Sequence, residues 1–204
     1  MNYFVLYVQR LLRWYASPAD GGRYDMREAC PHCGTGSVRL DPLFVVSSAC
    51  KAGVAATYKQ QIVVSSDVHA RLVAAGVRSL RRALGRNREP VNFWSLEPEM
   101  VLPAWSRDSK GFERSEIQPP CVFCHRDGFY DRPKESLSLI YDIDPGVDIC
   151  ATWEHFGASR LDASFDKSLF ASPRLIVSER VREVLDGSKG VSFAEVKFKI
   201  PNEK

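Results

Sequence analysis

Two close pairs of cysteines constrain this chain more than any other feature. The first pair is Cys30 and Cys33, the second is Cys121 and Cys124, and two residues separate the cysteines of each pair. Two such pairs supply the four thiolates of a tetrahedral structural zinc site. A closed site of this kind leaves no coordination position for water or substrate. We therefore predict that Zn²⁺ bound by these four cysteines stabilises the fold and performs no catalysis.

Two histidines beside the cysteines leave an alternative open. His32 lies inside the first pair, and His125 directly follows the second. If one cysteine were not a ligand, either histidine could complete a site of three cysteines and one histidine. A fifth ligand is not expected, because closed zinc sites are four-coordinate. The four cysteines remain the predicted ligands.

The other two cysteines, Cys50 and Cys150, are expected to be buried free thiols, because small or apolar residues surround them. The segment 1–8 is apolar, but Gln9 and Arg10 interrupt it and no charged segment precedes it. We predict neither a signal peptide nor a membrane span. Paired spacing in a chain without a leader favours metal binding over disulfides, and hence a cytoplasmic location.

The composition is that of an ordinary globular protein. With 204 residues, 45% of them hydrophobic and 26% charged, the chain is long enough for one large domain or two small ones that share a core. The formal net charge is only +3, so nucleic-acid binding is possible but not indicated. The most basic stretch contains Arg81, Arg82, Arg86 and Arg88, and we interpret it as a solvated face.

The apolar pattern predicts an α+β fold with mixed or antiparallel sheets and a few short helices. One helix is expected after the N-cap residues 65–67, with Val68, Leu72 and Val73 on its apolar face, and a second over 179–185. Strands are predicted, in chain order, over 1–8, 43–46, 61–64, 137–143, 175–177 and 191–200. Shorter elements are expected at 11–15, 80–84 and 153–156.

An internal similarity links the two parts of the chain. Residues 64–72 align without gaps to residues 177–185. We therefore predict one zinc-stapled domain over 1–204, built from two similar halves, 1–89 and 121–204, that share the tetra-cysteine site. An ordinary strand-helix-strand unit would give the same similarity by chance, and this alternative stays open.

The segment 90–120 is expected to connect the two halves, because it is rich in proline and aromatic residues. Its aromatic side chains, with Trp94, Trp105 and Phe112 foremost, could anchor a partner. The simpler expectation is that they pack in the core.

Three stretches carry a resemblance to a known family. They are Cys30-Pro31-His32-Cys33-Gly34, then Cys121-Val122-Phe123-Cys124 followed by Arg126-Asp127-Gly128-Phe129, and residues 175–181 leading to Gly190-Val191-Ser192-Phe193. The chain resembles the double-CXXCG motif proteins, which include immunity proteins to polymorphic bacterial toxins. The resemblance implies a non-enzymatic protein that binds a cognate toxin. His125 departs from the family pattern, which has glycine there, and this change implies either an altered turn or a ring nitrogen near the metal.

The absence of catalytic motifs agrees with a non-enzymatic role. The sequence contains no nucleophile elbow, phosphate loop or HExxH helix. A zinc-ribbon-like nucleic-acid-binding protein is the alternative, although the paired cysteines of compact ribbons are closer in sequence. A dithiol redox enzyme would need a CxxC at a helix N-terminus after a strand, and neither pair has this context. The sequence leaves the toxin and the oligomeric state open.

Overall fold

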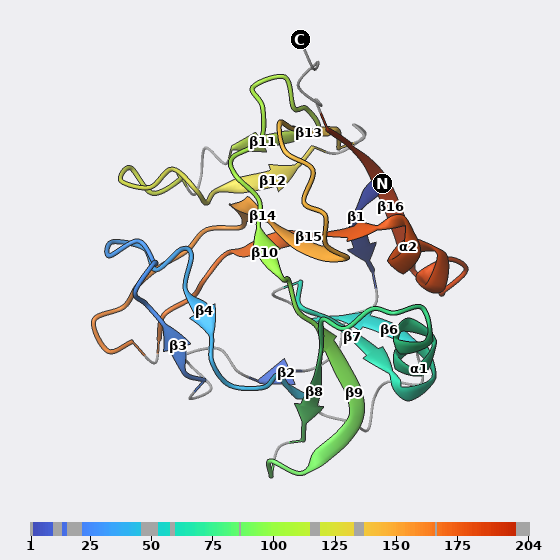
Figure 1. Ribbon diagram of the computed structural model, residues 1–204. Helices are drawn as coiled ribbons and strands as arrows, with labels where there is room; N and C mark the ends of the chain where they lie inside the picture. Colours follow the sequence, from blue (N-terminus) through green and yellow to red (C-terminus); the bar gives the residue numbers. More distant parts are fainter. Residues whose placement is uncertain are drawn as a thin grey trace.

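The computed structural model describes residues 2–9, 14–15, 22–45, 53–57, 60–85, 87–114, 119–132, 137–165 and 167–198 (Figure 1). Within these residues the chain forms two six-stranded sheets, two two-stranded hairpins and two short helices. The sheets are mixed, with most neighbouring strands antiparallel. The predicted α+β class is consistent with this arrangement, in which strands predominate.

Sheet A combines a strand from the beginning of the chain with strands from residue 100 onward. Its order is β10-β14-β15-β1-β16-β13. Neighbours are antiparallel, except that β10 is parallel to β14 and β13 is parallel to β16. The strands are β1 (Tyr3–Val8), β10 (Met100–Val101), β13 (Leu139–Tyr141), β14 (Ile149–Phe156), β15 (Ser172–Ser178) and β16 (Val191–Phe198).

Sheet B is formed by the first half of the chain and has the order β2-β5-β8-β9-β7-β6. Only β5 and β8 are parallel neighbours among its described pairs. The strands are β2 (Trp14–Tyr15), β5 (Phe44–Val45), β6 (Val54–Ala56), β7 (Ile62–Ser65), β8 (Leu80–Leu84) and β9 (Pro90–Leu96). The hairpins are β3 (Tyr24–Asp25) with β4 (Val38–Arg39), and β11 (Phe112–Arg114) with β12 (Phe129–Asp131).

One apolar cluster joins the two sheets. Val64 of sheet B and Val177 of sheet A both belong to it, together with Leu72 and Leu185 from the two helices. Val63, the neighbour of Val64, belongs to a separate cluster on the opposite face of sheet B. Successive residues of a strand point to opposite faces, so β7 is buried on both sides. Burial of this apolar surface is the main favourable term in folding.

The two helices follow strands directly, as their serine caps predict. Helix α1 (Ser66–Ala74) begins after the N-cap Ser65, and α2 (Glu179–Leu185) begins after the N-cap Ser178. The Ser178 hydroxyl accepts a hydrogen bond from Val181 N (3.4 Å), which satisfies one of the free amides at a helix start. The helices lie next to each other in Figure 1. None of the described helices is long and apolar enough to cross a membrane.

Helix α1 corrects one detail of the predicted apolar face. Val68 and Leu72 are buried, four residues apart on one side of the helix, whereas Val73 is 52% exposed. Val73 follows Leu72 by one residue, a rotation of about 100° in a helix with 3.6 residues per turn, and this rotation turns it toward solvent.

The other predicted elements agree with the structure within the described residues, apart from their ends; residues 11–13, 46 and 199–200 of the predicted elements lie outside the described residues. The undecided segment 80–84 forms strand β8, and 153–156 is the end of the longer strand β14. The segment 90–120 is more than a connector, because Pro90–Leu96 forms β9 between β7 and β8. Proline lacks an amide donor but is tolerated at the first residue of a strand, which is where Pro90 lies.

The predicted division into halves 1–89 and 121–204 is not confirmed in that form. Strand β1, from the first half, pairs with β15 and β16 of the second. Strand β9, from the segment between the halves, pairs with β7 and β8 of the first. The two sheets nevertheless repeat one pattern, because β6-β7-β9-β8-β5 and β14-β15-β1-β16-β13 have the same succession of antiparallel and parallel pairs.

Candidate metal centre

Each cysteine pair lies in the loop of a hairpin. Cys30 and Cys33 lie between β3 and β4, and Cys121 and Cys124 lie between β11 and β12. We call residues 30–37 the first metal loop and residues 121–128 the second. The two loops project from one side of the molecule, away from the helices (Figure 1). The hairpins thus bring together cysteines that are 91 positions apart in sequence.

The two loops make the same turn. Gly34 N donates to Cys30 O (2.8 Å), and His125 N donates to Cys121 O (3.0 Å). The residue after the second cysteine has positive φ in both loops, +77° at Gly34 and +54° at His125. Glycine takes this left-handed conformation without steric cost, whereas a side chain such as that of His125 takes it less readily. The departure from glycine therefore leaves the turn unaltered.

The four sulfur atoms have the spacing of a tetrahedral metal site. All lie within 4.8 Å of one another, with Cys30 Sγ 3.9 Å from Cys121 Sγ and Cys33 Sγ 3.6 Å from Cys124 Sγ. A zinc ion about 2.3 Å from each sulfur would place the sulfurs about 3.8 Å apart in a regular tetrahedron. The distances are far too long for a disulfide bond, which is about 2.05 Å. The predicted four residues thus fit a metal ion.

The two neighbouring histidines do not belong to this cluster. No histidine lies in the group of possible ligands found among the described residues. His32 and His125 are both exposed. The His32 ring instead stacks on Phe123 of the other loop, with ring centroids 3.4 Å apart and planes 6° apart. The four-cysteine set is therefore the arrangement that the geometry supports.

Close packing fixes the first metal loop in place. A Cβ atom at Gly34 would lie 2.2 Å from Phe170 Cε1, and one at Gly36 would lie 2.7 Å from Arg126 Nη1 of the second loop. Phe170 packs edge-to-face with Tyr24 of β3. Glycine at position 34 is therefore required both by the positive φ of the turn and by the close approach of Phe170.

Hydrogen bonds connect the two loops independently of a metal. Thr35 Oγ1 lies 3.1 Å from Cys33 Sγ and donates to Ser159 Oγ (2.8 Å). The buried carboxylate of Asp127 accepts from Ser159 N (2.9 Å) and from Cys121 N (2.8 Å). Groups of this kind orient metal ligands and raise metal affinity. Asp127 and Thr35 occur within four residues of the cysteines, but Ser159 carries no sequence signal, and we did not predict this network.

We expect Asp127→Asn to lower the free energy of unfolding by about 2 kcal/mol, because one charge-assisted hydrogen bond to a backbone amide is lost. It should also weaken metal binding by about 10- to 100-fold, as changes next to ligands do. Chemical denaturation and competition with a zinc chelator measure the two effects. Asp162→Asn is the matched control, because this carboxylate bonds within its own loop, to Ser164 and Arg160. Equal effects of the two changes would contradict the role of Asp127.

The thiols of the centre differ in acidity. Burial acts to raise the pKa of the Cys30 thiol, but hydrogen bonds from the backbone of His32 and Cys33 outweigh it and lower that pKa overall. Burial raises the pKa of the Cys33 thiol and that of the Cys124 thiol. A metal ion must displace these protons, because the thiolate is the ligand. Arg126, two residues after Cys124, has its guanidinium 4.7 Å from the Trp153 ring centroid, and its Nε donates to Trp153 O (3.2 Å).

The remaining sequence candidates lie outside the metal centre. Cys150 is fully buried, as predicted, and burial raises its pKa to about 12. Cys50 lies outside the described residues. Trp105 and Phe112 pack against each other and against Phe129. Trp94 stacks on His69, with ring centroids 4.1 Å apart. These aromatic side chains therefore contribute to packing.

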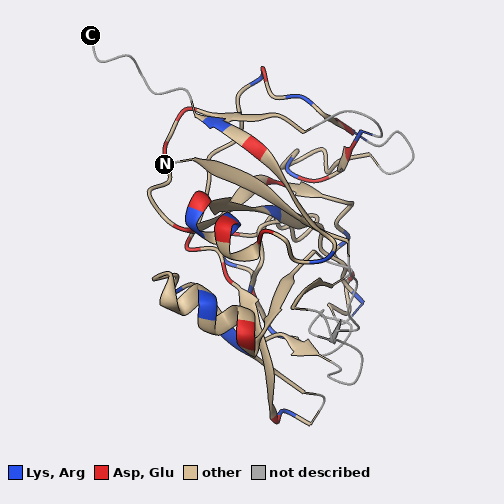
Figure 2. Ribbon diagram, turned by 90° about the vertical axis from the view of Figure 1, so that its right-hand side faces the viewer, with Lys and Arg blue, Asp and Glu red and all other residues tan. Residues whose placement is uncertain are grey.

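The basic stretch also has local contacts. Arg81 donates to Leu40 O (2.7 Å), Arg82 donates to Val91 O (3.2 Å), and the Arg88 guanidinium lies 5.9 Å from the Phe44 ring centroid. Arg86 lies outside the described residues. Figure 2 shows basic and acidic residues interspersed along the ribbon. Each described arginine of this stretch thus has a contact within the protein.

Comparisons with known proteins give no relative for this chain. No protein-family model, no curated protein and no solved structure matches it.

Proposed function

We propose that the chain is a non-enzymatic immunity protein that binds a cognate bacterial toxin and neutralises it in the cytoplasm. The observation that carries the proposal is the closed set of four sulfurs within 4.8 Å of one another. Four protein ligands satisfy a tetrahedral ion and leave no position for substrate. The centre therefore cross-links the two metal loops and keeps the surface that they form rigid. The toxin as partner is inferred from the resemblance of the cysteine motifs and the C-terminal stretch.

Zinc is the metal that we propose for the centre. Four thiolates in a tetrahedron suit zinc or iron, and zinc is the usual ion where the site is closed and structural. Metal analysis of the purified protein distinguishes the two. One zinc per chain in colourless protein is expected, and iron would contradict the assignment.

We infer further that the two sheets are copies of one structural unit that share the metal centre. In chain order, one unit consists of β1, the first metal loop, β7, α1 and β8, and the other of β9, the second metal loop, β15, α2 and β16. The first strands are exchanged, since β1 precedes the first metal loop but lies in sheet A, and β9 precedes the second but lies in sheet B. The matching strand order and the equivalent serine caps support this inference.

The second metal loop is the surface that we propose for contact with the toxin. Phe123 is 63% exposed and Val122 is 72% exposed, although both lie between metal ligands. The cysteines on either side and the stacked His32 ring hold these side chains in one place. A preorganised aromatic side chain loses little conformational freedom on binding, and aromatic residues often dominate interface energies.

The test begins with the toxin encoded next to this gene. Co-expression of the chain should restore growth of cells that produce the toxin. Phe123→Asp should lower affinity for the toxin by about 10-fold or more, because a charge replaces an apolar anchor. Growth protection and calorimetric titration measure these effects.

The control variant is Ile143→Asp, which changes another exposed apolar residue, 46% exposed and outside both metal loops. Both variants should keep their zinc and their unfolding midpoint. If Phe123→Asp still protected the cells fully, the proposed contact surface would be wrong, but the immunity function would not be excluded. Failure of the unmodified chain to protect cells would exclude the immunity function.

Nucleic-acid binding is the alternative that has less support. The arginines of the basic stretch each have a contact in sheet B or in an adjacent loop, as described above for Arg81, Arg82 and Arg88. A protein that neutralises several phosphates shows affinity that falls steeply with salt. Tight, salt-sensitive binding of DNA or RNA in a filter assay would favour this alternative over a protein partner.

A further inference from the structure

A pocket of about 220 Å³ lies where the two sheets meet the metal loops. Its walls include strands of both sheets, β4, and the residues Gly36 and Arg126 of the two metal loops. Apolar wall residues are Val38, Leu96, Val101, Phe170, Pro173 and Leu175. Pockets for drug-sized ligands are larger, roughly 300–1,000 Å³. This pocket has room for a smaller organic molecule, and the staple function of the metal centre does not account for it.

Arg39 is the most unusual group in the pocket. Its side chain is only 8% exposed, and its Nη2 pairs with Glu97 Oε1 at 2.6 Å. Its Nε and Nη1 are buried and have no hydrogen-bond partner among the described residues. Burying a donor of a charged group without a partner is costly, so such groups in folded proteins call for an explanation. A bound acceptor would supply one.

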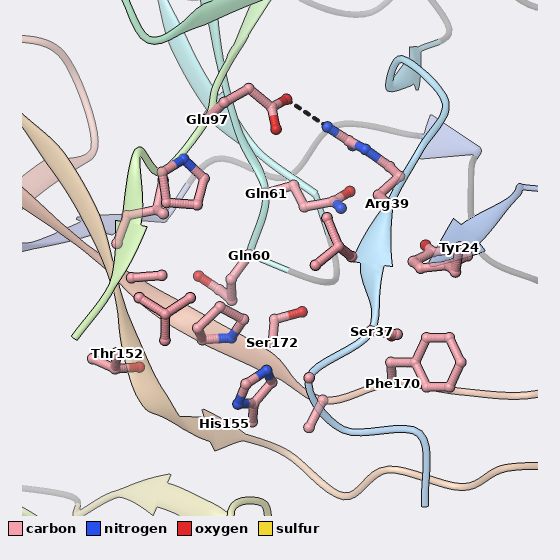
Figure 3. Close-up of a pocket in the computed structure, with 18 of the residues that line it drawn as sticks. Tyr24, Ser37, Arg39, Gln60, Gln61, Glu97, Thr152, His155, Phe170 and Ser172 are labelled. Carbon is pink, nitrogen blue, oxygen red and sulfur yellow. Dashed lines mark hydrogen bonds and ion pairs between the residues drawn. The ribbon is translucent and has the colours of Figure 1, made fainter. Parts of the chain in front are cut away.

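Two further polar groups face the same space. Gln61 lines the same pocket as Arg39 (Figure 3), and its Oε1 is also buried without a partner among the described residues. His155 lies at the other end of the pocket in Figure 3. Its Nδ1 is 3.0 Å from Trp153 O, which makes Nδ1 the donor and leaves Nε2 as an acceptor. Polar groups thus stand at both ends of an apolar cavity.

We propose that this pocket binds a small carboxylate with an apolar body, whose oxygens accept hydrogen bonds from Arg39. A guanidinium is well suited to carboxylate oxygens. Glu97 already neutralises part of the Arg39 charge, and this favours a monoanion over a dianionic phosphate. The apolar walls provide the surface against which the rest of the molecule packs, as in other small-molecule sites. This site is independent of the proposed toxin surface.

The test is an NMR titration of the zinc-loaded full chain with phenylacetate, 2-phenylethanol and inorganic phosphate. Phenylacetate combines a carboxylate with an apolar ring, and the alcohol retains the ring without the charge. Saturable shifts of residues around His155 and Arg39 are expected with phenylacetate. Its affinity should exceed that of the alcohol and of phosphate by about 10-fold or more, as a charge-assisted hydrogen bond predicts.

Variants locate the site. Arg39→Met should weaken phenylacetate binding by about 10-fold or more, whereas Arg39→Lys should have a smaller effect because it keeps the charge. Arg81→Met is the matched control, because Arg81 bonds to the neighbouring Leu40 O but does not line the pocket.

Three results would overturn the proposal. They are the absence of saturation by phenylacetate, which would leave Arg39 Nε and Nη1 without a bound carboxylate, equal affinity for phenylacetate and 2-phenylethanol, and unchanged binding by folded Arg39→Met. The comparison of acid and alcohol uses the unmodified chain, so it decides the question even if the Arg39 variants do not fold.

Discussion

Replacing Cys33 with serine is expected to abolish the folded state. Cys33 is buried, and its Sγ lies 3.6 Å from Cys124 Sγ across the centre. Serine supplies no thiolate, so three ligands remain and metal affinity falls. Zinc binding contributes on the order of 10–16 kcal/mol in small domains, whereas the net stability of a folded protein is about 5–15 kcal/mol. The free energy lost with the ion therefore exceeds the stability that packing alone provides. We expect Cys124→Ser to behave in the same way.

Zinc content, circular dichroism and thermal unfolding measure this effect, and a strong chelator should reproduce it in the unmodified chain. The matched control is Cys150→Ser, which changes a fully buried cysteine that is not part of the cluster. This variant should lose some stability, because a polar hydroxyl replaces a thiol in the core, but it should keep its zinc. Unmodified protein purified without metal, or a Cys33→Ser variant with an unchanged melting temperature, would refute the metal-site proposal.

The sequence predicted the local features of this protein better than its long-range pairings. The spacing of Cys30 and Cys33 fits one turn of backbone, both helices begin directly after a serine, and the hydroxyl of Ser178 accepts from the amide of Val181, three residues away. Such signals depend on neighbouring residues, so they are readable without a structure. Strand β9 was harder to predict, because the prolines around it suggested a connection, and its position between β7 and β8 depends on contacts with distant residues.

The exchange of β1 and β9 between the sheets could not be predicted for the same reason. An alternating apolar pattern indicates that a segment is a strand, but many strands offer compatible partners, and register is decided by packing over the whole sheet. The candidate sites show a similar limit. The four metal ligands were predicted from spacing, whereas Ser159 and Arg39 gain their roles from residues that are far away in sequence.

Glu154 provides the second large expected effect, on the pH dependence of stability. The carboxyl group is 3% exposed, with Oε1 accepting from Trp105 N (3.0 Å) and Oε2 without a partner among the described residues. Burial raises its pKa from 4.5 to about 7. The folded state thus holds a proton that the unfolded chain releases, and stability falls as pH rises from about 4.5 to about 7. Above that range the loss is on the order of 3 kcal/mol.

We therefore expect Glu154→Gln, which stays neutral at every pH, to gain stability relative to the unmodified chain as pH rises. The difference in unfolding free energy should grow by about 2 kcal/mol between about pH 5.5 and pH 8.5 and then level off. Urea denaturation of both zinc-loaded proteins across this range measures it. Burial lowers the pKa of His155 to about 4, so His155 makes both proteins less stable below about pH 6.5, but this contribution cancels in the difference.

The control for Glu154 is Glu195→Gln, which changes an exposed carboxylate on β16. Its stability curve is expected to run parallel to that of the unmodified chain, because this side chain is exposed to solvent. If the glutamine amide at position 154 lowers stability by a constant amount, the whole curve of unfolding free energy against pH shifts, but its slope does not change. Parallel curves for Glu154→Gln as well would mean that the carboxyl group is solvated in the folded protein, and its burial beside Trp105 would then be wrong.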